Sequence, residues 1–291
     1  MQDAQTKRYT ELLAELLPEM RAEVLRVQPV GGGSINRCVK LETSKGFFFL
    51  KENDAKAFPG MFAAEKRGLE LLASTNTFVV PDPLGLLEKN GSAYLLLSWL
   101  EKAAPAAKSS YEAGTLLAKL HRHSEKTFGL DHDNYIGSLR QSNRQQASWE
   151  EFFVLERLLP QVQLARDAQR IDSQLVKQAE KCCARAADLF PMEKPALLHG
   201  DLWGGNFLFT NRGPSVFDPA IYYGHREMDL AMTQLFGGFD DDFYAGYENE
   251  FPLESGWRKR IPYGQLYPLL VHVNLFGGGY IYDVKSILSA F

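Results

Sequence analysis

The first hundred residues alternate short apolar runs with glycine-containing turns, the pattern of a small antiparallel sheet. An amphipathic helix is predicted over 6–20, with its leucines on one side. Glycine-containing turns at 31–33 and 44–46 then separate three strands, and a helix at 59–74 precedes another strand pair around Asn90 and Gly91. The predicted strands cover 24–30, 36–43, 46–52, 84–88 and 94–98.

The rest of the chain has mostly helical periodicity, interrupted between 195 and 220 by a loop flanked by short strands. Residues 99–108, with Pro105 and small side chains, indicate a connector. We therefore predict an α+β fold with an N-terminal lobe at 1–98, a connector at 99–108 and a catalytic C-terminal lobe at 109–291. The helices predicted in that lobe cover 110–123, 149–166, 171–189, 226–237, 239–249 and 258–276.

Composition and charge exclude several classes of protein. Hydrophobic residues make up 45% of the chain and charged residues 23%, which is typical of globular proteins. A net charge of −4 argues against a nucleic-acid partner. The sequence contains no long apolar stretch of the kind that signal peptides and membrane spans need, so we expect no membrane association. Three cysteines, two of them adjacent, do not suit a disulfide framework and favour a cytoplasmic protein.

Two segments in the C-terminal part carry candidate catalytic chemistry. In HGDLWGGN, Asp201 precedes Asn206 by five positions, and His199 stands where it could brace the loop. This is the spacing of a kinase catalytic loop, in which the aspartate accepts the proton of the acceptor hydroxyl and the asparagine binds magnesium. Asp218 ends the apolar segment VFD, where a second magnesium carboxylate is expected. A polar loop and a turn-capping aspartate are the simpler interpretations of the two segments.

The N-terminal part supplies candidate phosphate-binding residues. Glycine lets the backbone approach a ligand closely, although a hairpin turn without a ligand would explain the glycine-rich segment as well. Lys51 follows an apolar strand and could reach phosphates, and Glu65 in the next helix could pair with it. Either side chain could equally lie in solvent, but the order of all these pieces predicts a phosphotransferase that uses ATP and Mg²⁺. The glycine-rich segment consists of Gly31, Gly32, Gly33 and Ser34.

The sequence resembles the fructosamine kinase (ketosamine-3-kinase) family, a branch of the protein-kinase-like phosphotransferases related to aminoglycoside and choline kinases. HGDLWGGN at 199–206 and FDPAIYYGHREMDLAMTQLFGGF at 217–239 carry the resemblance, together with NYIGS at 134–138, and it extends from about 20 to 290. It implies a two-lobed fold, with a small antiparallel-sheet lobe containing one key helix and a larger, mostly helical lobe. It also implies transfer of the ATP γ-phosphate to a sugar hydroxyl of a small-molecule or protein-bound ketosamine. The phosphorylated ketosamine then falls apart, which repairs glycated amines.

The resemblance also implies residue roles. Asp201 is the base, Asn206 and Asp218 bind magnesium, and Lys51 binds phosphate with Glu65 as its partner. Adenine would lie against a hinge that comprises Ser98, Trp99 and Leu100.

The resemblance also covers residues outside this set. Trp203 would either face the sugar or pack the loop onto the helical lobe. For the residues that match the motif after Asp218, a structural role is favoured. Some family members carry a cysteine where Ser34 stands, and Cys38 is expected to be a buried, inert thiol. The motif residues in question are His225, Glu227 and Asp229, and Cys182 and Cys183 are expected to fill core or surface positions.

Two alternative functions stay open at this point. The first is a kinase of another small molecule, such as an aminoglycoside or choline, and the second is a non-catalytic nucleotide-binding scaffold. An acidic pocket would favour a polycationic antibiotic, whereas aromatic residues with mixed polar groups would favour a sugar amine. The ketosamine used in the cell and the oligomeric state cannot be read from the sequence.

Overall fold

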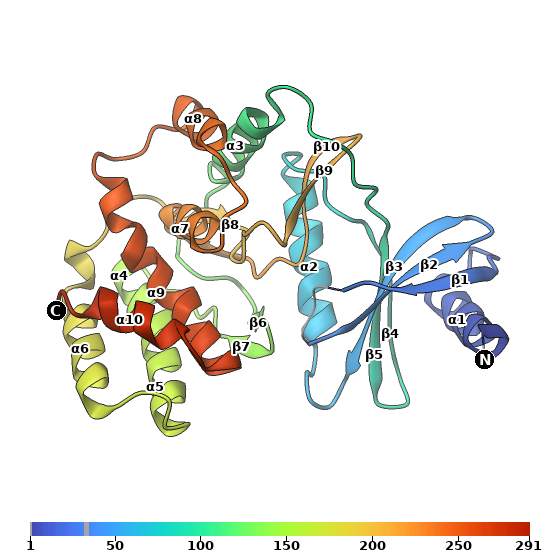
Figure 1. Ribbon diagram of the computed structural model, residues 1–291, viewed down its shortest axis with the longest axis horizontal. Coiled ribbons are helices and arrows are strands. Elements are labelled where there is room, and N and C mark those ends of the chain that lie inside the picture. The colour runs from blue at the N-terminus through green and yellow to red at the C-terminus, as the bar shows by residue number, and fades with distance from the viewer. Residues whose placement is uncertain (1, 32–34) are drawn as a thin grey trace. The chain divides into compact units, whose positions relative to one another are not determined.

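A five-stranded antiparallel sheet organises the N-terminal part, in the order β1-β2-β3-β5-β4 (Figure 1). The computed structural model describes residues 2–31 and 35–291, and its sheet and helices confirm the predicted α+β architecture. In the register of the sheet, Lys51 of β3 lies between Cys38 of β2 and Leu95 of β5. The strands are β1 (Val24–Pro29), β2 (Arg37–Thr43), β3 (Gly46–Asp54), β4 (Pro83–Lys89) and β5 (Ser92–Ser98).

The two faces of this sheet pack against different helices. Because side chains alternate along a strand, Leu50 and Lys51 point to opposite faces. Leu50 belongs to a buried cluster with the leucines of α1 (Gln2–Leu16). Lys51 meets α2 (Met61–Ser74), which buries its own apolar side. The sheet therefore separates an apolar layer from the layer that carries the candidate phosphate-binding lysine.

Helix α1 ends earlier than the periodicity predicted. Its last residue is Leu16, whereas the pattern suggested that the helix would extend to 20. Proline at position 18 has no amide hydrogen and disfavours helical geometry in the residue before it, so a further turn cannot form there.

A hairpin from late in the sequence completes the N-terminal unit. One compact unit comprises 1–104 with 208–217, and the other comprises 105–207 with 218–291. The hairpin strands are β9 (Phe207–Thr210) and β10 (Gly213–Val216). The Val79 amide donates to the Pro214 carbonyl, and the Val79 carbonyl accepts from the Val216 amide. The Ala103 amide donates to the Phe209 carbonyl at 2.8 Å. The sequence pattern had placed this segment in the C-terminal lobe, and these hydrogen bonds assign it to the first unit.

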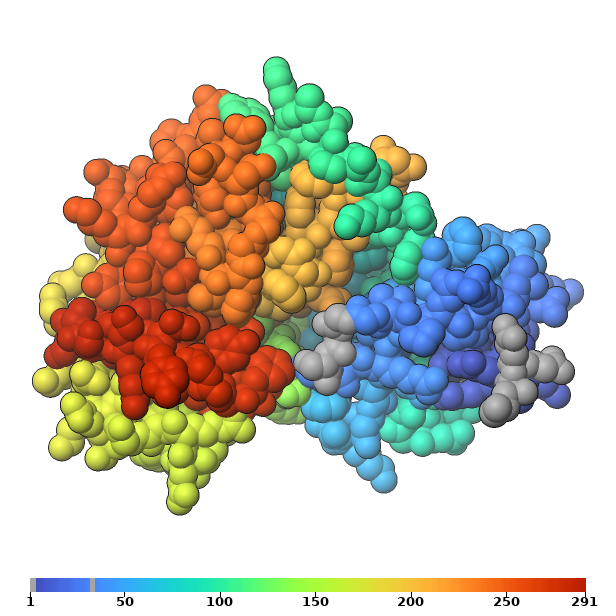
Figure 2. Space-filling view, viewed as in Figure 1, coloured from blue at the N-terminus to red at the C-terminus, as the bar shows by residue number. Residues whose placement is uncertain are grey.

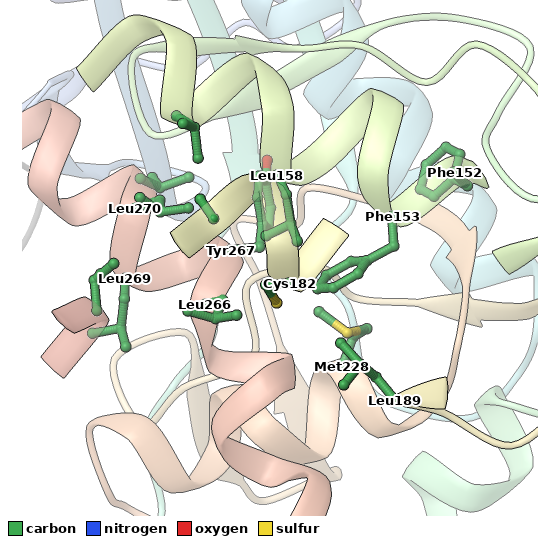
Figure 3. Packing of buried hydrophobic residues seen from close by; sticks show 14 of the residues in the cluster. Phe152, Phe153, Leu158, Cys182, Leu189, Met228, Leu266, Tyr267, Leu269 and Leu270 are labelled. Atoms are coloured by element: carbon green, nitrogen blue, oxygen red, sulfur yellow. The ribbon is translucent and has the colours of Figure 1, made fainter. Parts of the chain in front are cut away.

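The second unit is mainly helical and contains a large apolar core (Figure 3). Phe152, Phe153 and Leu270 are among its buried side chains. The last helix, α10, contacts α6, and Figure 2 shows the red C-terminal end of the chain beside the yellow-green segment. The helices are α3 (Ser109–Leu120), α4 (Trp149–Phe152), α5 (Leu159–Asp167), α6 (Ser173–Ala184), α7 (Glu227–Leu235), α8 (Asp241–Glu250), α9 (Trp257–Phe276) and α10 (Tyr280–Leu288).

Several elements of this unit differ from the predicted ones. The helix predicted at 149–166 contains a π-helical segment, Phe153–Leu158, between α4 and α5. The helix predicted at 171–189 ends at Ala184 and is followed by a short 3₁₀ turn, Ala186–Asp188. Helix α10 was not predicted. Neither was the hairpin of β6 (Asn134–Ile136) and β7 (Leu139–Gln141), and the remaining strands are β8 (Ala196–Leu198) and β11 (Tyr222–Gly224).

Within the part of the chain that the structure describes, no helix has both the length and the apolar character that crossing a bilayer requires.

Candidate active site

The loop after β8 brings Asp201 and Asn206 into direct contact. The Asn206 Nδ2 atom donates to the Asp201 carboxylate Oδ2 and to the Asp201 main-chain oxygen, both at 2.9 Å. Glycine at 205 leaves room for the Trp203 ring, because a Cβ atom there would lie 2.2 Å from it and the ring would have to move. The five-residue spacing seen in the sequence therefore corresponds to a closed loop, in which the amide nitrogen orients the candidate base.

Asp218 lies beside this loop in a strained backbone conformation. Its φ angle is +55°, in the left-handed region that non-glycine residues seldom adopt. Two residues later, the Ala220 amide donates to the His199 carbonyl at 2.9 Å, which joins the two segments. Burial, together with the negative charge of Asp218, raises the pKa of Asp201 to about 7, and the hydrogen bond from Asn206 opposes this rise. The structure thus brings Asp201, Asn206 and Asp218 together.

The donor atoms of this group suit a magnesium ion. Both amide hydrogens of Asn206 are donated to Asp201, so its side-chain oxygen is the atom left to bind a cation. Asp218 adds a carboxylate. Hard oxygen ligands of this kind are those that Mg²⁺ prefers, and in kinases one or two protein ligands suffice because phosphate and water complete the shell.

The carboxylate of Asp229 in α7 binds the start of the loop at 199–206. Its buried carboxylate accepts the main-chain N–H groups of His199 at 2.8 Å and Gly200 at 2.9 Å, and it lies 3.2 Å from His121 Nε2. Burial alone would raise the pKa of Asp229, but these partners outweigh it and hold the pKa below its usual value. The structural role favoured for Asp229 in the sequence analysis agrees with these contacts.

Replacing Asp229 with asparagine is expected to lower the free energy of unfolding at about pH 7 by about 2 kcal/mol, the size of a hydrogen bond to a charged group. Because the pKa of Asp229 is lower in the folded protein than its ordinary value of 3.8, the ionised carboxylate stabilises the folded state at pH values above 3.8. This stabilisation is lost as the pH falls from 3.8 through the lower folded-state pKa. Urea unfolding at several pH values should therefore show wild type and variant converging in acid. Asp283→Asn, an exposed position, serves as the control, and a difference that stays constant with pH would contradict the argument.

The other residues of the motif after Asp218 also make structural contacts. Glu227 accepts two hydrogen bonds from the Arg260 guanidinium, at 2.6 and 2.8 Å. The His225 ring nitrogen Nδ1 accepts from the Glu227 amide at 3.3 Å, and burial lowers the pKa of His225 to about 4, so the ring is neutral. These contacts fix the start of α7 and, through it, the position of Asp229.

In the N-terminal unit, Lys51 and Glu65 form a buried ion pair. The Lys51 Nζ atom donates to Glu65 Oε1 at 2.7 Å, and the side chains are only 3% and 9% exposed. The alternative of two solvent-exposed side chains is therefore excluded. The pair fixes the ammonium group at one place on the face of the sheet that α2 covers.

Because removing one partner of a buried pair leaves a charge in a poorly solvated place, Lys51→Met is expected to lower the free energy of unfolding by about 3 kcal/mol. Lys66→Met, in the helix α2 that also carries Glu65, is the matched control. Lys66 lies the same 2.7 Å from its partner Glu70, but the side chains are 35% and 51% exposed, so the loss should stay below about 1 kcal/mol. Equal losses in urea denaturation would contradict the assigned difference between the two pairs.

The predicted hinge begins at the last residue of β5, Ser98, and continues through Trp99 and Leu100. Ser98 is tied to Asp82, since its hydroxyl accepts the Asp82 amide at 2.8 Å and its own amide donates to the Asp82 carbonyl at 2.9 Å. The Trp99 ring lies 4.2 Å from the Lys40 ammonium, which also covers Phe47 at 4.2 Å, while Leu100 is half-buried. Lys40 was not among the residues predicted from the sequence. Gly31 is exposed at the start of the glycine-rich segment, and Gly32, Gly33 and Ser34 lie outside the described residues.

An aromatic cluster adjoins the catalytic loop through Trp203. The Trp203 ring meets Phe236 edge-on with centroids 5.9 Å apart, and Phe236 lies 4.7 Å from His272. Burial lowers the pKa of His272, so its ring is neutral. Sequence reasoning singled out Trp203 alone, although FGGF at 236–239 and HVNLFGGGY at 272–280 contained the other rings. The aromatic cluster consists of Trp203, Phe236, His272, Phe276 and Tyr280.

The structure gives no catalytic role to Cys182 and Cys183. Burial raises the pKa of Cys182 to about 12 and that of Cys183 to about 11, which disfavours the reactive thiolate. Cys38 is half-buried, not fully buried as expected, because it lies near the start of β2.

Comparison with known proteins gives a consistent result. The sequence model of the fructosamine kinase family matches residues 7–291. A "Probable ketoamine kinase" of Enterococcus faecium is 40% identical over 270 residues, which cover 91% of this chain and 95% of that protein. The "Protein-ribulosamine 3-kinase, chloroplastic" of Arabidopsis thaliana is 38% identical over 282 residues, with 94% and 85% covered.

Solved structures extend the comparison to the fold. A crystal structure named "putative fructosamine-3-kinase" from Thermobifida fusca has a TM-score of 0.87 at 35% identity, with 97% of both chains covered. An aminoglycoside phosphotransferase in complex with AMP-PNP and hygromycin B has a TM-score of 0.64 at 16% identity, and covers 97% of this chain and 98% of its own. The second likeness concerns the fold alone.

Proposed function

Because the chain belongs to the fructosamine kinase family, we propose that it transfers the γ-phosphate of ATP to a sugar hydroxyl of ketosamines. The phosphorylated ketosamine is expected to decompose and release the amine, so the reaction would repair glycated amines. The observation that carries this proposal is the contact between Asp201 and Asn206 beside Asp218, the arrangement that phosphoryl transfer requires.

Each predicted residue has a defined task in this proposal. Asp201 accepts a hydrogen bond from the acceptor hydroxyl and takes its proton as the oxygen attacks phosphorus. Asn206 keeps the Asp201 carboxylate turned toward the acceptor. Bound magnesium, held by Asn206 and Asp218, would neutralise the negative charge of the phosphates.

The N-terminal unit is proposed to bind the nucleotide. Lys51, oriented by Glu65, holds the phosphates as a fixed positive charge. Main-chain groups of the hinge are proposed to bind adenine, and the glycine-rich segment to surround the phosphates. The hinge comprises Ser98, Trp99 and Leu100, and the glycine-rich segment comprises Gly31, Gly32, Gly33 and Ser34.

The aromatic cluster supports a sugar amine as the acceptor. Phe236 and Phe276 are 38% and 54% exposed, so part of the cluster faces solvent and can receive a ligand. Flat rings suit the apolar face of a sugar, whereas a polycationic aminoglycoside would call for carboxylates. Trp203 contacts Phe236 as well, so it both packs the catalytic loop onto the helical unit and belongs to the proposed sugar site.

The proposal is tested by measuring ADP release from Mg-ATP with a ribulosamine derivative of lysine as the acceptor. An aminoglycoside and choline are the comparison acceptors. Release that depends on the ketosamine supports the proposal. Turnover with another acceptor alone would support the kinase activity and contradict the proposed substrate. ATP binding without turnover on any acceptor would favour the alternative of a non-catalytic nucleotide-binding scaffold. We also propose a cytoplasmic location, because three cysteines, two of them adjacent, do not suit a disulfide framework.

A further inference from the structure

Two buried amide side chains hold the main chain that follows Asp218. The Asn134 Nδ2 atom donates to the Ile221 carbonyl at 2.8 Å, and the Gln141 Nε2 atom donates to the Ala220 carbonyl at 3.1 Å. Asn134 is 5% exposed and Gln141 is 2% exposed. Both come from the short β6–β7 hairpin, for which the proposed function gives no task.

The same amides belong to a larger buried network. The Gln141 Nε2 atom also donates to Asn134 Oδ1 at 2.7 Å, and the Tyr267 hydroxyl, whose side chain is labelled in Figure 3, donates to Gln141 Oε1 at 2.7 Å. Asn143 donates to Asn134 Oδ1 at 3.1 Å, and the fully buried Arg157 donates to Asn143 Oδ1 at 2.7 Å. Every hydrogen-bonding group of the Gln141 amide therefore has a partner, which fixes its orientation.

The network binds the backbone next to Asp218, whose conformation is strained. A left-handed conformation at a non-glycine residue persists only where the surroundings determine it, and Asp218 has this conformation. Ala220 is held on one side by the His199 carbonyl, which accepts its amide, and on the other by Gln141. The carbonyls that Gln141 and Asn134 bind lie two and three residues after Asp218, close enough to fix the turn that carries its carboxylate.

We propose that Asn134 and Gln141 are positioning residues for the reaction. By binding the carbonyls of Ala220 and Ile221 they keep Asp218 in the turn from which its carboxylate reaches the divalent cation. Groups that orient a metal ligand from the second layer commonly change the metal affinity about tenfold or more when they are replaced. This inference rests on the proposed function, because it takes Asp218 as a cation ligand.

The test is the affinity of the purified full chain for Mn²⁺ in the presence of ADP, followed by electron paramagnetic resonance. Gln141→Leu removes both donated hydrogen bonds and is expected to weaken Mn²⁺ binding about tenfold. Tyr267→Phe removes only the hydroxyl that orients Gln141. It should weaken binding about threefold, the effect of one neutral hydrogen bond, and it keeps the test informative if Gln141→Leu folds poorly.

Asn274→Leu is the matched control for loss of stability. Asn274 is a buried amide of the same unit, and its Nδ2 donates to Gln161 O at 2.9 Å and to Gln161 Oε1 at 2.8 Å. It should lower the melting temperature without changing Mn²⁺ affinity. If Asp218→Ala binds Mn²⁺ like wild type, the cation assignment fails and this inference fails with it. If Asp218→Ala loses binding while Gln141→Leu and Tyr267→Phe keep wild-type affinity, only the positioning role is overturned.

Discussion

Replacing Asp201 with asparagine is expected to lower kcat by about a thousandfold and to leave the affinity for Mg-ATP nearly unchanged. General-base catalysis by a positioned carboxylate contributes about 10²–10⁴ to a rate, and asparagine cannot take the proton of the acceptor hydroxyl. The substitution keeps the size of the side chain, and Asn206 can still donate to its oxygen. Steady-state turnover and nucleotide titration, measured on the same preparation, separate the two effects.

The control for Asp201→Asn is Asp283→Asn, which removes one exposed carboxylate of the same unit and should keep full activity. Burial and Asp218 raise the pKa of Asp201 to about 7, so wild-type turnover should fall as the pH drops below its pKa and the carboxylate takes up a proton. A bound cation at Asp218 would offset the charge that raises this pKa and move the fall to lower pH. Full activity of Asp201→Asn would remove the base assignment.

Asp218→Ala is expected to abolish the dependence of nucleotide affinity on magnesium. The variant removes the carboxylate of the proposed cation site, whereas Lys51 and the hinge, in the other unit, are untouched. ATP titrations with magnesium and with chelator should therefore give nearly the same affinity in the variant, and a clear difference in wild type.

Backbone strain requires a second variant at this position. Alanine tolerates the left-handed φ of +55° less well than aspartate, so Asp218→Ala could lose function through the turn alone. Asparagine tolerates that conformation, and Asp218→Asn removes only the charge. Loss of the magnesium dependence in both variants assigns the effect to the carboxylate, and its retention in both would remove Asp218 from the cation site.

Features that depend on local spacing were predictable from the sequence. The strands on either side of the glycine-rich segment and the helix that carries Glu65 follow from periodicity, and the segment that brings Asp201 and Asn206 into one loop follows from the motif. The Lys51–Glu65 contact was foreseen because strand and helix are neighbours in the chain, and the family pattern gave the partner.

Features that depend on contacts across long stretches of chain were not predictable. The hairpin of β6 and β7 has strands of three residues, too short to show an alternating pattern. The rings around Trp203 come from segments more than thirty residues apart, so only the folded chain shows them as one cluster. Within 149–166, helical periodicity persists through the π-helical segment, and a single residue's shift in hydrogen bonding leaves no clear mark on the sequence.

The hairpin of β9 and β10 has a consequence for how the protein is made. The amides of Val79 and Ala103 need acceptors that lie in 208–217, so the first unit is incomplete until that segment has left the ribosome. At about 10 residues per second, synthesis of the roughly one hundred intervening residues takes about 10 s. During that time the five strands can pair, but the main-chain groups of Val79 and Ala103 that bind the hairpin stay exposed to chaperones and proteases. An N-terminal fragment ending at 104 would lack their partners in 208–217 permanently.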